Sequence, residues 1–421
     1  MYELRSIGEE EYEGFHRRLS SAFGEDSTEE ARAYERHTFE FDRSIVAIDG
    51  GELVGTAGAF SFELTVPGPA VVSVAGVSWV GVLPTHRRRG VLRAMMDHQL
   101  DDVVARGEAI AVLTASEAGI YGRFGYGVAT RAATVDIAAS GAELRSPSTG
   151  RGRIRLLDAP AAGKVLPGVH DAYRRSRPGA INRSEDTWAA YLSDPKDWRA
   201  GASGRFYAVH EADDGVADGY AAYRVKPSES GEETGKTVIV SEVHTAGPDA
   251  GSRSRAAACE IEAALFEYLL AIDLQRTLRL ARRPLDDPLR WRLVDSRRYC
   301  TTKVADWLWA RLLDIPAALA ARRYAVAGKL VVAVHDAFRP VNDGRYLLDG
   351  GPDGATVTRL DGTGPSPDVS LPVDALGAAY LGGVPFTILA AAGLVSGERD
   401  ALARADAMFV STPLPYCDEP F

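Results

Sequence analysis

The chain of 421 residues is long enough for roughly two to four domains, and its 46% apolar and 25% charged residues are typical of globular proteins. A formal net charge of −10 disfavours a general nucleic-acid binder, which needs positive charge against the phosphates. The three cysteines have no metal-ligand spacing, and no apolar stretch approaches the ~20 residues of a membrane helix. Because the acidic N-terminus also lacks an apolar signal core, we expect a cytoplasmic protein without a metal, membrane or nucleic-acid partner.

The first third of the chain predicts helices and strands in an alternating order. Apolar residues at helical spacing run over 7–35, with a break at Glu25 and Asp26. Further apolar stretches between glycine and proline turns predict strands at 44–48, 53–66, 71–82 and 109–114 and a helix at 90–106. The strands on either side of that helix are expected to be parallel, because a helical crossover connects them.

A basic, glycine-containing turn stands between the strand 71–82 and the helix that follows. It reads Pro84-Thr85-His86-Arg87-Arg88-Arg89-Gly90. A helix that begins there presents free amides at the positive end of its dipole, and a phosphate binds at such an end. Gly90 would let the backbone approach the anion, and the arginines raise the positive potential. The pattern predicts a phosphate-binding turn, and a solvated basic turn is the alternative.

From residue 151 the predicted order begins again. Strands are expected at 205–210, 219–225, 237–243 and 277–280, with a helix at 256–271 before the last of them. The loop 247–253 lacks the arginine and glycine arrangement of the first module. This second module is therefore expected to bind no cofactor, and is either a degenerate copy of the first or an unrelated α/β module.

The last third predicts strands at 329–334, 344–348 and 354–359 and helices around 373–381 and 401–407. The segment 384–389 could line a lipid cavity, but its apolar residues are better explained by core packing. Pro413, Pro415 and Pro420 keep the final tail extended. Because the tail ends in an aromatic residue, Phe421, its terminus is expected to be anchored.

Two motifs resemble those of GNAT N-acetyltransferases. Arg88-Arg89-Gly90-Val91-Leu92 is similar to the loop Arg/Gln-x-x-Gly-x-Gly/Ala that binds the acetyl-CoA pyrophosphate in that superfamily. The longer string 84–90 resembles the narrower Eis (enhanced intracellular survival) family, and so does Ala115-Ser116-Glu117-Ala118-Gly119-Ile120-Tyr121-Gly122-Arg123-Phe124-Gly125-Tyr126-Gly127. The order and spacing of the two motifs, the chain length and the closing phenylalanine agree with this resemblance.

The resemblance implies an α/β (α+β) protein with tandem GNAT folds and a C-terminal domain like the sterol carrier proteins. An N-terminal GNAT domain over 1–150 would bind acetyl-CoA and carry out catalysis. A central, degenerate GNAT-like domain would occupy 151–298, and the sterol-carrier-protein-like domain would occupy 299–421. The family also implies a homohexamer.

The resemblance assigns acetyl-CoA as cosubstrate and gives its contacts. These are the backbone of Val80, Gly81 and Val82, the turn and helix start Arg87, Arg88, Arg89, Gly90, Val91, Leu92 and Arg93, and the loop residues Ser116 and Glu117. An amide of the strand would polarise the thioester oxygen.

Two proton transfers complete the implied mechanism. Tyr121 matches the family's general acid, which protonates the departing thiolate. The free α-carboxylate of Phe421 matches its unusual general base. Because an α-carboxyl has a pKa near ~3.5, burial or a water relay would have to raise its effectiveness. At the penultimate position, where the family has a charged residue, this chain has Pro420.

The expected acceptors are amines of aminoglycoside-like polyamines, as in Eis proteins, and Asp26, Tyr34 and Trp79 are candidate substrate contacts. A protein or peptide lysine acetyltransferase is the first alternative. A lipid-binding carrier with a non-catalytic GNAT scaffold is the second.

Overall fold

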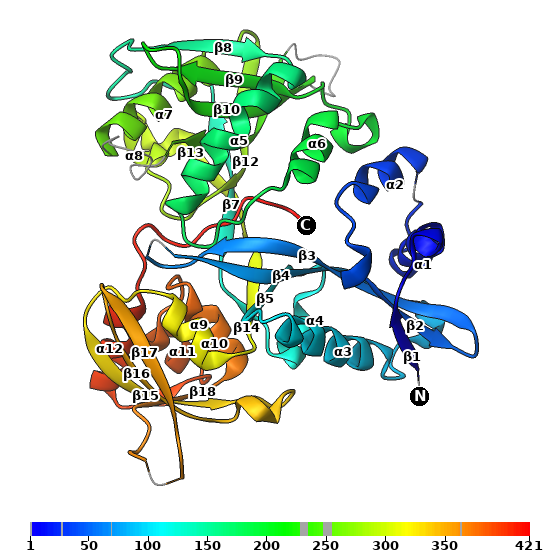
Figure 1. Ribbon diagram of the computed structural model, residues 1–421. Helices are drawn as coiled ribbons and strands as arrows, with labels where there is room; N and C mark the ends of the chain where they lie inside the picture. The colour runs from blue at the N-terminus through cyan, green and yellow to red at the C-terminus, as the bar shows by residue number, and fades with distance from the viewer. Residues whose placement is uncertain (1, 27, 69, 228–234, 247–254, 363) are drawn as a thin grey trace. The chain divides into compact units, whose positions relative to one another are not determined.

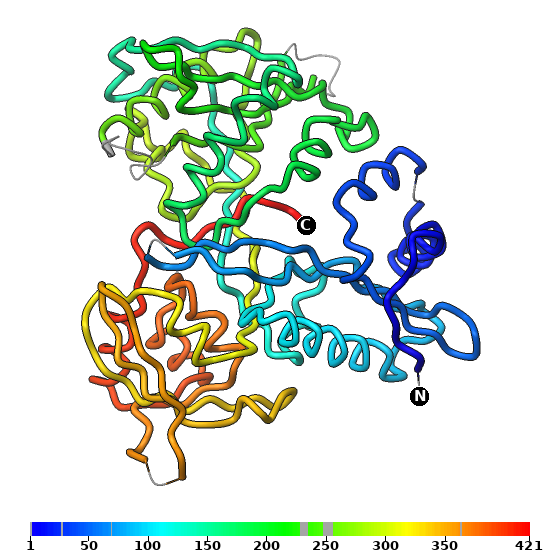
Figure 2. Tube along the Cα trace, viewed as in Figure 1, coloured from blue at the N-terminus to red at the C-terminus, as the bar shows by residue number. Residues whose placement is uncertain are grey.

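The computed structural model describes residues 2–26, 28–68, 70–227, 235–246, 255–362 and 364–421, which are coloured in Figures 1 and 2. Two compact units account for the chain. The first contains residues 1–130, 307–415 and 419–421, and the second contains 131–306 and 416–418.

The first unit is built on a seven-stranded sheet in the order β1-β2-β3-β4-β5-β14-β6. The strands are β1 (Glu3–Ser6), β2 (Ile45–Asp49), β3 (Glu52–Thr65), β4 (Val71–Val82), β5 (Ile110–Thr114), β6 (Gly127–Val128) and β14 (Leu308–Leu312). The helices of this region are α1 (Tyr12–Phe23), α2 (Glu29–Arg36), α3 (Val91–Ala105) and α4 (Ala118–Tyr121). The predicted break at Glu25 and Asp26 therefore lies between α1 and α2.

The central strands β4 and β5 are parallel, as expected for a helical crossover, but their pairing is short. Only 75–77 of β4 pair with 111–113 of β5. Beyond this point β4 contains a bulge in which Trp79 adopts a φ of 52°. Within the described residues, the rest of β4 up to Val82 therefore has no strand on the β5 side.

The core of this sheet is closed by α3. Its buried residues Val91, Met95, Met96, Leu100 and Val103 join apolar side chains from β2 to β5. Gly55 on β3 allows the helix to approach, since an added Cβ would lie 2.9 Å from the Met95 sulfur. The contact fixes the start of α3 against the sheet.

The second unit repeats the same order of elements. Its sheet runs β13-β7-β12-β11-β10-β9-β8, with β11 and β12 parallel. The strands are β7 (Arg131–Ala138), β8 (Arg153–Leu157), β9 (Phe206–Glu211), β10 (Ala217–Pro227), β11 (Lys236–Thr245), β12 (Gln275–Arg283) and β13 (Tyr299–Asp306); the helices are α5 (Ala159–Arg175), α6 (Glu185–Ser193), α7 (Arg255–Leu270) and α8 (Leu289–Arg292). The order from β8 to β12 matches that from β1 to β5 (Figure 1), so the predicted second copy of the fold is confirmed. The loop 247–253, on which the prediction of a missing cofactor site rested, lies outside the described residues.

The last part of the first unit has a five-stranded sheet in the order β17-β16-β15-β18-β19. The elements are β15 (Gly328–His335), β16 (Gly344–Gly351), β17 (Gly354–Leu360), β18 (Val369–Pro372), β19 (Ser396–Gly397), α9 (Ile315–Ala321), α10 (Val373–Tyr380), α11 (Phe386–Ala391) and α12 (Arg399–Phe409). Phe386 is buried with its ring 4.8 Å from that of Phe409, and Leu389 is buried too, whereas Ile388 is exposed. The segment 384–389 thus contributes to the core of this region.

Two strands, β7 and β14, pair in the sheet of the other repeat and not in that of the repeat they follow. β7 follows the first repeat but pairs in the second sheet, between β12 and β13. β14 follows the second repeat but pairs between β5 and β6 in the first sheet. The predicted domains 1–150, 151–298 and 299–421 are each one continuous stretch of the chain. Each seven-stranded sheet, in contrast, combines strands from separate stretches. None of the described helices has the length and apolar character needed to cross a membrane.

Candidate active site

The turn after β4 leaves the N-terminus of α3 open. Gly90 is the residue before the helix and has a φ of 90°, a conformation that favours glycine. No side chain caps the helix, and the described residues offer no hydrogen-bond acceptor to the amides of Val91, Leu92 and Arg93. Such amides at a positive helix end form a site for a phosphate.

The arginines of the turn differ in what they contact. Arg87 donates from Nη2 to the carbonyl of Ala22 at 2.8 Å, and the carbonyl of Arg89 accepts from the Tyr2 hydroxyl at 2.9 Å. The side chains of Arg88, Arg89 and Arg93 are exposed. One arginine and one backbone carbonyl therefore hold the turn in place, while the exposed guanidinium groups remain available to an anion.

The part of β4 that has no β5 partner is fixed by a hydrogen bond from β3, itself bound by a side chain of α3, and by packing on α1. Thr56 donates from its hydroxyl to the carbonyl of Trp79 at 2.9 Å, and buried Gln99 donates to the carbonyl of Gly58 at 2.8 Å. Gly81 packs against α1, where an added Cβ would lie 3.0 Å from that of Ala22. The backbone of Val80, Gly81 and Val82 is thereby fixed next to the start of α3.

Tyr121 ends the short helix α4, which follows β5. Its side chain is buried, and its ring lies 6.0 Å from that of Tyr126. Burial, with a smaller contribution from the charge of Glu117, raises the pKa of Tyr121 to about 12. Its hydroxyl makes no hydrogen bond to any described residue, so it can donate to a ligand. Ser116 and Glu117 are exposed in the preceding loop.

The C-terminal residue is bound at the place where β4 and β5 part. Thr114, the last residue of β5, donates from its hydroxyl to an oxygen of Phe421 at 2.7 Å. The Phe421 ring lies 4.9 Å from that of Phe62 on β3, and an added Cβ on Gly76 of β4 would come within 3.3 Å of it. Phe421 is therefore anchored in the first unit, as expected.

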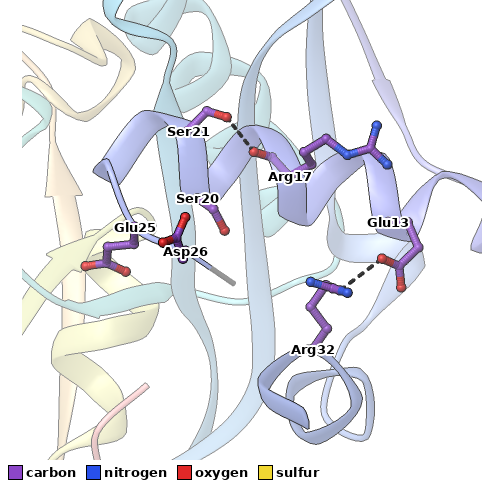
Figure 3. A pocket seen from close by; sticks show the side chains of 7 residues that line it. All are labelled: Glu13, Arg17, Ser20, Ser21, Glu25, Asp26 and Arg32. Carbon is purple, nitrogen blue, oxygen red and sulfur yellow. Dashed lines mark hydrogen bonds and ion pairs between the residues drawn. The ribbon is translucent and has the colours of Figure 1, made fainter. Parts of the chain in front are cut away.

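A cavity of about 290 Å³ lies between α1 and the loop that leads to α2 (Figure 3). Its lining consists of Glu13, Arg17, Ser20, Ser21, Glu25, Asp26 and Arg32. Figure 3 shows Arg32 reaching Glu13, with which it forms an ion pair of 3.0 Å, while Glu25 and Asp26 lie at the far end of α1. Within the described chain Glu25 and Asp26 form no ion pair, so this cavity carries excess negative charge.

The other two candidate substrate residues lie outside this lining. Trp79 packs in an aromatic row, with its ring 4.7 Å from Phe39 and 4.5 Å from Phe60. Phe60 in turn lies 6.2 Å from the ring of Phe421. Tyr34 is half-buried on α2. The structure thus connects Trp79 to Phe421 through Phe60, and places Asp26 near Glu25 at the end of α1 instead.

Sequence reasoning missed Thr114 and the row of phenylalanines. Thr114 and Phe421 are 307 positions apart, so no local pattern could have paired them. The alternation in Phe60-Ser61-Phe62 indicates two residues on one face of β3, which was the one available signal for the phenylalanines.

Two parallel strands that part, an open helix N-terminus after a basic glycine turn, and a buried tyrosine after the second strand define a GNAT-type acetyltransferase. Family models agree: an Acetyltransferase (GNAT) domain matches residues 3–129, a second one matches 179–312, and a Sterol carrier protein domain matches 315–418.

Full-length relatives narrow the assignment. The chain is 41% identical over its whole length to an uncharacterized N-acetyltransferase of Streptomyces avermitilis, covering 99% of that protein. It is 33% identical to the N-acetyltransferase Eis of Mycobacterium tuberculosis, over 97% of this chain and 96% of the relative. The crystal structure of Eis1 from Mycobacterium abscessus is 34% identical and superposes over all of both chains with a TM-score of 0.84. The chain belongs to the Eis family of GNAT N-acetyltransferases, a fold that implies acetyl-CoA and an acceptor substrate.

Proposed function

We propose that this enzyme transfers the acetyl group of acetyl-CoA to amines of aminoglycoside-like polyamines, by direct transfer in a ternary complex. The open amides at the start of α3 and the exposed arginines would hold the pyrophosphate, and the backbone of Val80, Gly81 and Val82 would hold the pantetheine arm. Ser116 and Glu117 would flank that arm. Acetyl-CoA supplies the acetyl thioester, and groups of the protein would carry out the two proton transfers.

Tyr121 is the proposed general acid. Because its pKa is raised to about 12, it keeps its proton at neutral pH and can donate it where a thiolate develops. A thiol has a pKa near ~8.5, so full transfer is uphill and the placement of the hydroxyl must supply much of the effect. The absence of a hydrogen-bond partner among the described residues supports this role, since the hydroxyl is not engaged elsewhere.

The α-carboxylate of Phe421 is the proposed general base, and its position is the observation that carries the proposal. The contact with Thr114 and the packing on Phe62 hold a carboxylate where the strands part. There it would bind the ammonium group of the acceptor and accept its proton, directly or through water. The residue that precedes it, Pro420, is uncharged.

A polycationic acceptor fits the charge of the cavity between α1 and α2. Glu25 and Asp26 form no ion pair with any described residue there, whereas Glu13 is paired with Arg32, and unpaired carboxylates attract ammonium groups. Trp79 and Tyr34 are proposed to extend the same acceptor side. Small polyamines and lysine peptides both carry such charge, so relative rates on a kanamycin-class aminoglycoside and on lysine peptides distinguish the two acceptor classes.

The decisive experiment places a few extra residues after Phe421. Thiol release from acetyl-CoA with an aminoglycoside should fall by about 100-fold or more, while acetyl-CoA affinity is unchanged. Phe421→Leu is the matched control, because leucine keeps an apolar side chain against Phe62 as well as the terminal carboxylate, and it should retain most of the activity. Full turnover by the extended protein would refute the carboxylate mechanism.

We also propose a cytoplasmic homohexamer, the assembly implied by the family. The molar mass from light scattering tests the assembly.

A further inference from the structure

A groove in the second unit lies between α5 and α6 and has a volume of about 560 Å³. It is lined by Gly163, Pro167, His170, Asp171, Arg174, Asn182, Arg183, Glu185, Trp188, Ala189 and Leu192. The two helices come close at one end, where an added Cβ on Gly163 would lie 2.9 Å from Leu192. Apolar side chains occupy that end, and polar ones occupy the other.

His170 is a buried polar group of the groove that has no hydrogen-bond partner among the described residues. It is 3% exposed, and its ring lies 5.5 Å from that of Trp188 and 5.4 Å from that of His244. Neither ring nitrogen makes a hydrogen bond to any residue that the structure describes. Burial, helped by Arg183 and His244, lowers the pKa of His170 to about 3, so the imidazole is neutral. It offers one donor and one acceptor.

Asp171, Arg174 and Arg183 of the groove wall have charged partners, whereas exposed Glu185 forms no ion pair with any described residue. Arg183 donates to both oxygens of Glu242, at 2.7 and 3.2 Å. Arg174 donates to Asp171 at 2.7 Å, and Asp171 also accepts from Arg175. Because the buried cations of the wall, Arg174 and Arg183, are paired with carboxylates, the interior of the groove does not favour a charged ligand; the one unpaired charge among the described lining residues, Glu185, is exposed.

The position of the groove in the repeat indicates a binding role. α5 and α6 are the first two helices of the second repeat, as α1 and α2 are of the first. The acidic cavity of the first repeat lies in the corresponding place. The two pockets differ in chemistry, since carboxylates line the first and a neutral imidazole with apolar walls lines the second.

We propose that this groove binds a small uncharged aromatic alcohol of the phenol type, with its ring against Pro167, Trp188 and Leu192 and its hydroxyl on His170. Because a hydroxyl both donates and accepts, it can pair with a ring nitrogen of the imidazole in either tautomer. The flat apolar walls match an aromatic ring. The site is independent of acetyl transfer, and its test needs no activity measurement.

The test titrates phenol into the full-length protein and follows the His170 imidazole signals by NMR, assigned through His170→Phe. Phenol should bind saturably at millimolar concentration, and toluene, which lacks the hydroxyl, about tenfold more weakly. His170→Phe should weaken phenol binding about tenfold, as measured by calorimetry, and leave toluene binding unchanged.

Variants of α6 supply the steric test. Ala189 is exposed and lines the groove, so Ala189→Trp should fill it and abolish binding of phenol. Ser193→Trp places the same bulk at an exposed position of the same helix outside the groove and should bind phenol as the wild type does. No saturable phenol binding, equal binding of phenol and toluene, equal binding by Ala189→Trp, or tighter binding of benzoate or benzylammonium than of phenol would each overturn the proposal.

Discussion

At the scale of single residues, Tyr121 and Tyr126 form a matched pair. Both are buried, and burial raises the pKa of each. The hydroxyl of Tyr126 is fully enclosed and, within the described chain, unpaired. Tyr121→Phe should lower kcat by about 100-fold or more with acetyl-CoA affinity unchanged, because only the proton donor is lost. Thiol release and calorimetry measure the two quantities.

Tyr126→Phe is the control for that experiment. It also removes a buried hydroxyl from a neighbouring ring, but one without a proposed role, so activity should be retained and stability should be equal or slightly higher. Equal losses in the two variants would mean that the effect is structural, and would contradict general-acid catalysis by Tyr121.

The pair His16 and Glu35 joins α1 to α2 and has opposing pH dependences. His16 Nδ1 lies 3.1 Å from Glu35 Oε2. Burial raises the pKa of Glu35 from 4.5 to about 7 and lowers that of His16 from 6.5 to about 4. Alone, Glu35 would lower the free energy of unfolding as pH rises from 4.5 to about 7, because the folded state holds its proton. His16 alone would raise that free energy between about 4 and 6.5, because the unfolded state then holds more protons. The two effects cancel across most of this range.

Glu35→Gln should expose the contribution of His16. Stability of α1 should then rise with pH between about 4 and 6.5, with a slope of up to about 1.4 kcal/mol per pH unit, whereas the wild type should vary little there. Amide hydrogen exchange in α1 measures the local free energy of opening. Parallel pH profiles of the two proteins would show that His16 is not held neutral by the fold.

At the scale of elements, the two ends of α3 offer a controlled test of the cofactor turn. Gly90 at its start and Gly107 after its end both have positive φ, at 90° and 78°, and neither has an atom within 4 Å of an added Cβ. Alanine at either position should cost about 1 kcal/mol of stability through backbone strain. Only Gly90→Ala should also weaken acetyl-CoA binding severalfold, because it distorts the turn that presents the amides. A binding titration measures the acetyl-CoA affinity of both variants. Equal affinities of Gly90→Ala and Gly107→Ala would contradict a role of this turn in cofactor binding.

Elements also show where sequence reasoning succeeds and where it ends. The order β4, turn, α3, β5 was predictable, because long apolar strands and a periodic helix are encoded by adjacent residues. The strand β14 was not predicted. Its five residues are all buried between β5 and β6, so they lack the polar alternation of a half-exposed strand. The bulge at Trp79 depends on hydrogen bonds from Thr56 and Gln99, which no local pattern reveals.

Some parts of the candidate site could likewise be predicted from the sequence, and others could not. The open amides at Gly90 and the position of Tyr121 follow from short motifs, whereas the role expected for Phe421 came from family resemblance alone. Its binding by Thr114 and Phe62 depends on the fold of the whole first unit.

At the scale of the whole molecule, the first sheet is completed by the last third of the chain. β14 contributes buried Trp309 to the first core, and Arg311 on the same strand forms a fully buried ion pair of 2.6 Å with Asp336. Helix α10 lies so close to β6 and β14 that a Cβ on Gly127 or on Gly377 would collide with backbone atoms. The range 1–150 alone lacks all of these contacts, so as an isolated fragment it should not fold cooperatively.

A shortened chain can restore the contacts, because the two cut ends are neighbours. Trp307 donates its amide to the carbonyl of Thr130 at 3.0 Å, and Thr130 donates its amide to the carbonyl of Leu308 at 3.0 Å. Replacing 131–306 by a short turn containing asparagine and glycine would therefore join β6 to β14 as a hairpin. This protein should show a cooperative thermal transition that acetyl-CoA raises, whereas the 1–150 fragment should show none.

The same shortened chain separates cofactor binding from turnover. In the full protein Asp418 in the tail accepts from His244 at 2.6 Å, and that partner is deleted together with 131–306. The end of the tail keeps Thr114 but loses this anchor, so acetyl-CoA binding should persist while thiol release falls. If the shortened protein turned over like the intact enzyme, the tail contacts with the second unit would be dispensable for placing the terminal carboxylate. If it failed to fold, the first unit would depend on more than the strands that complete its sheet.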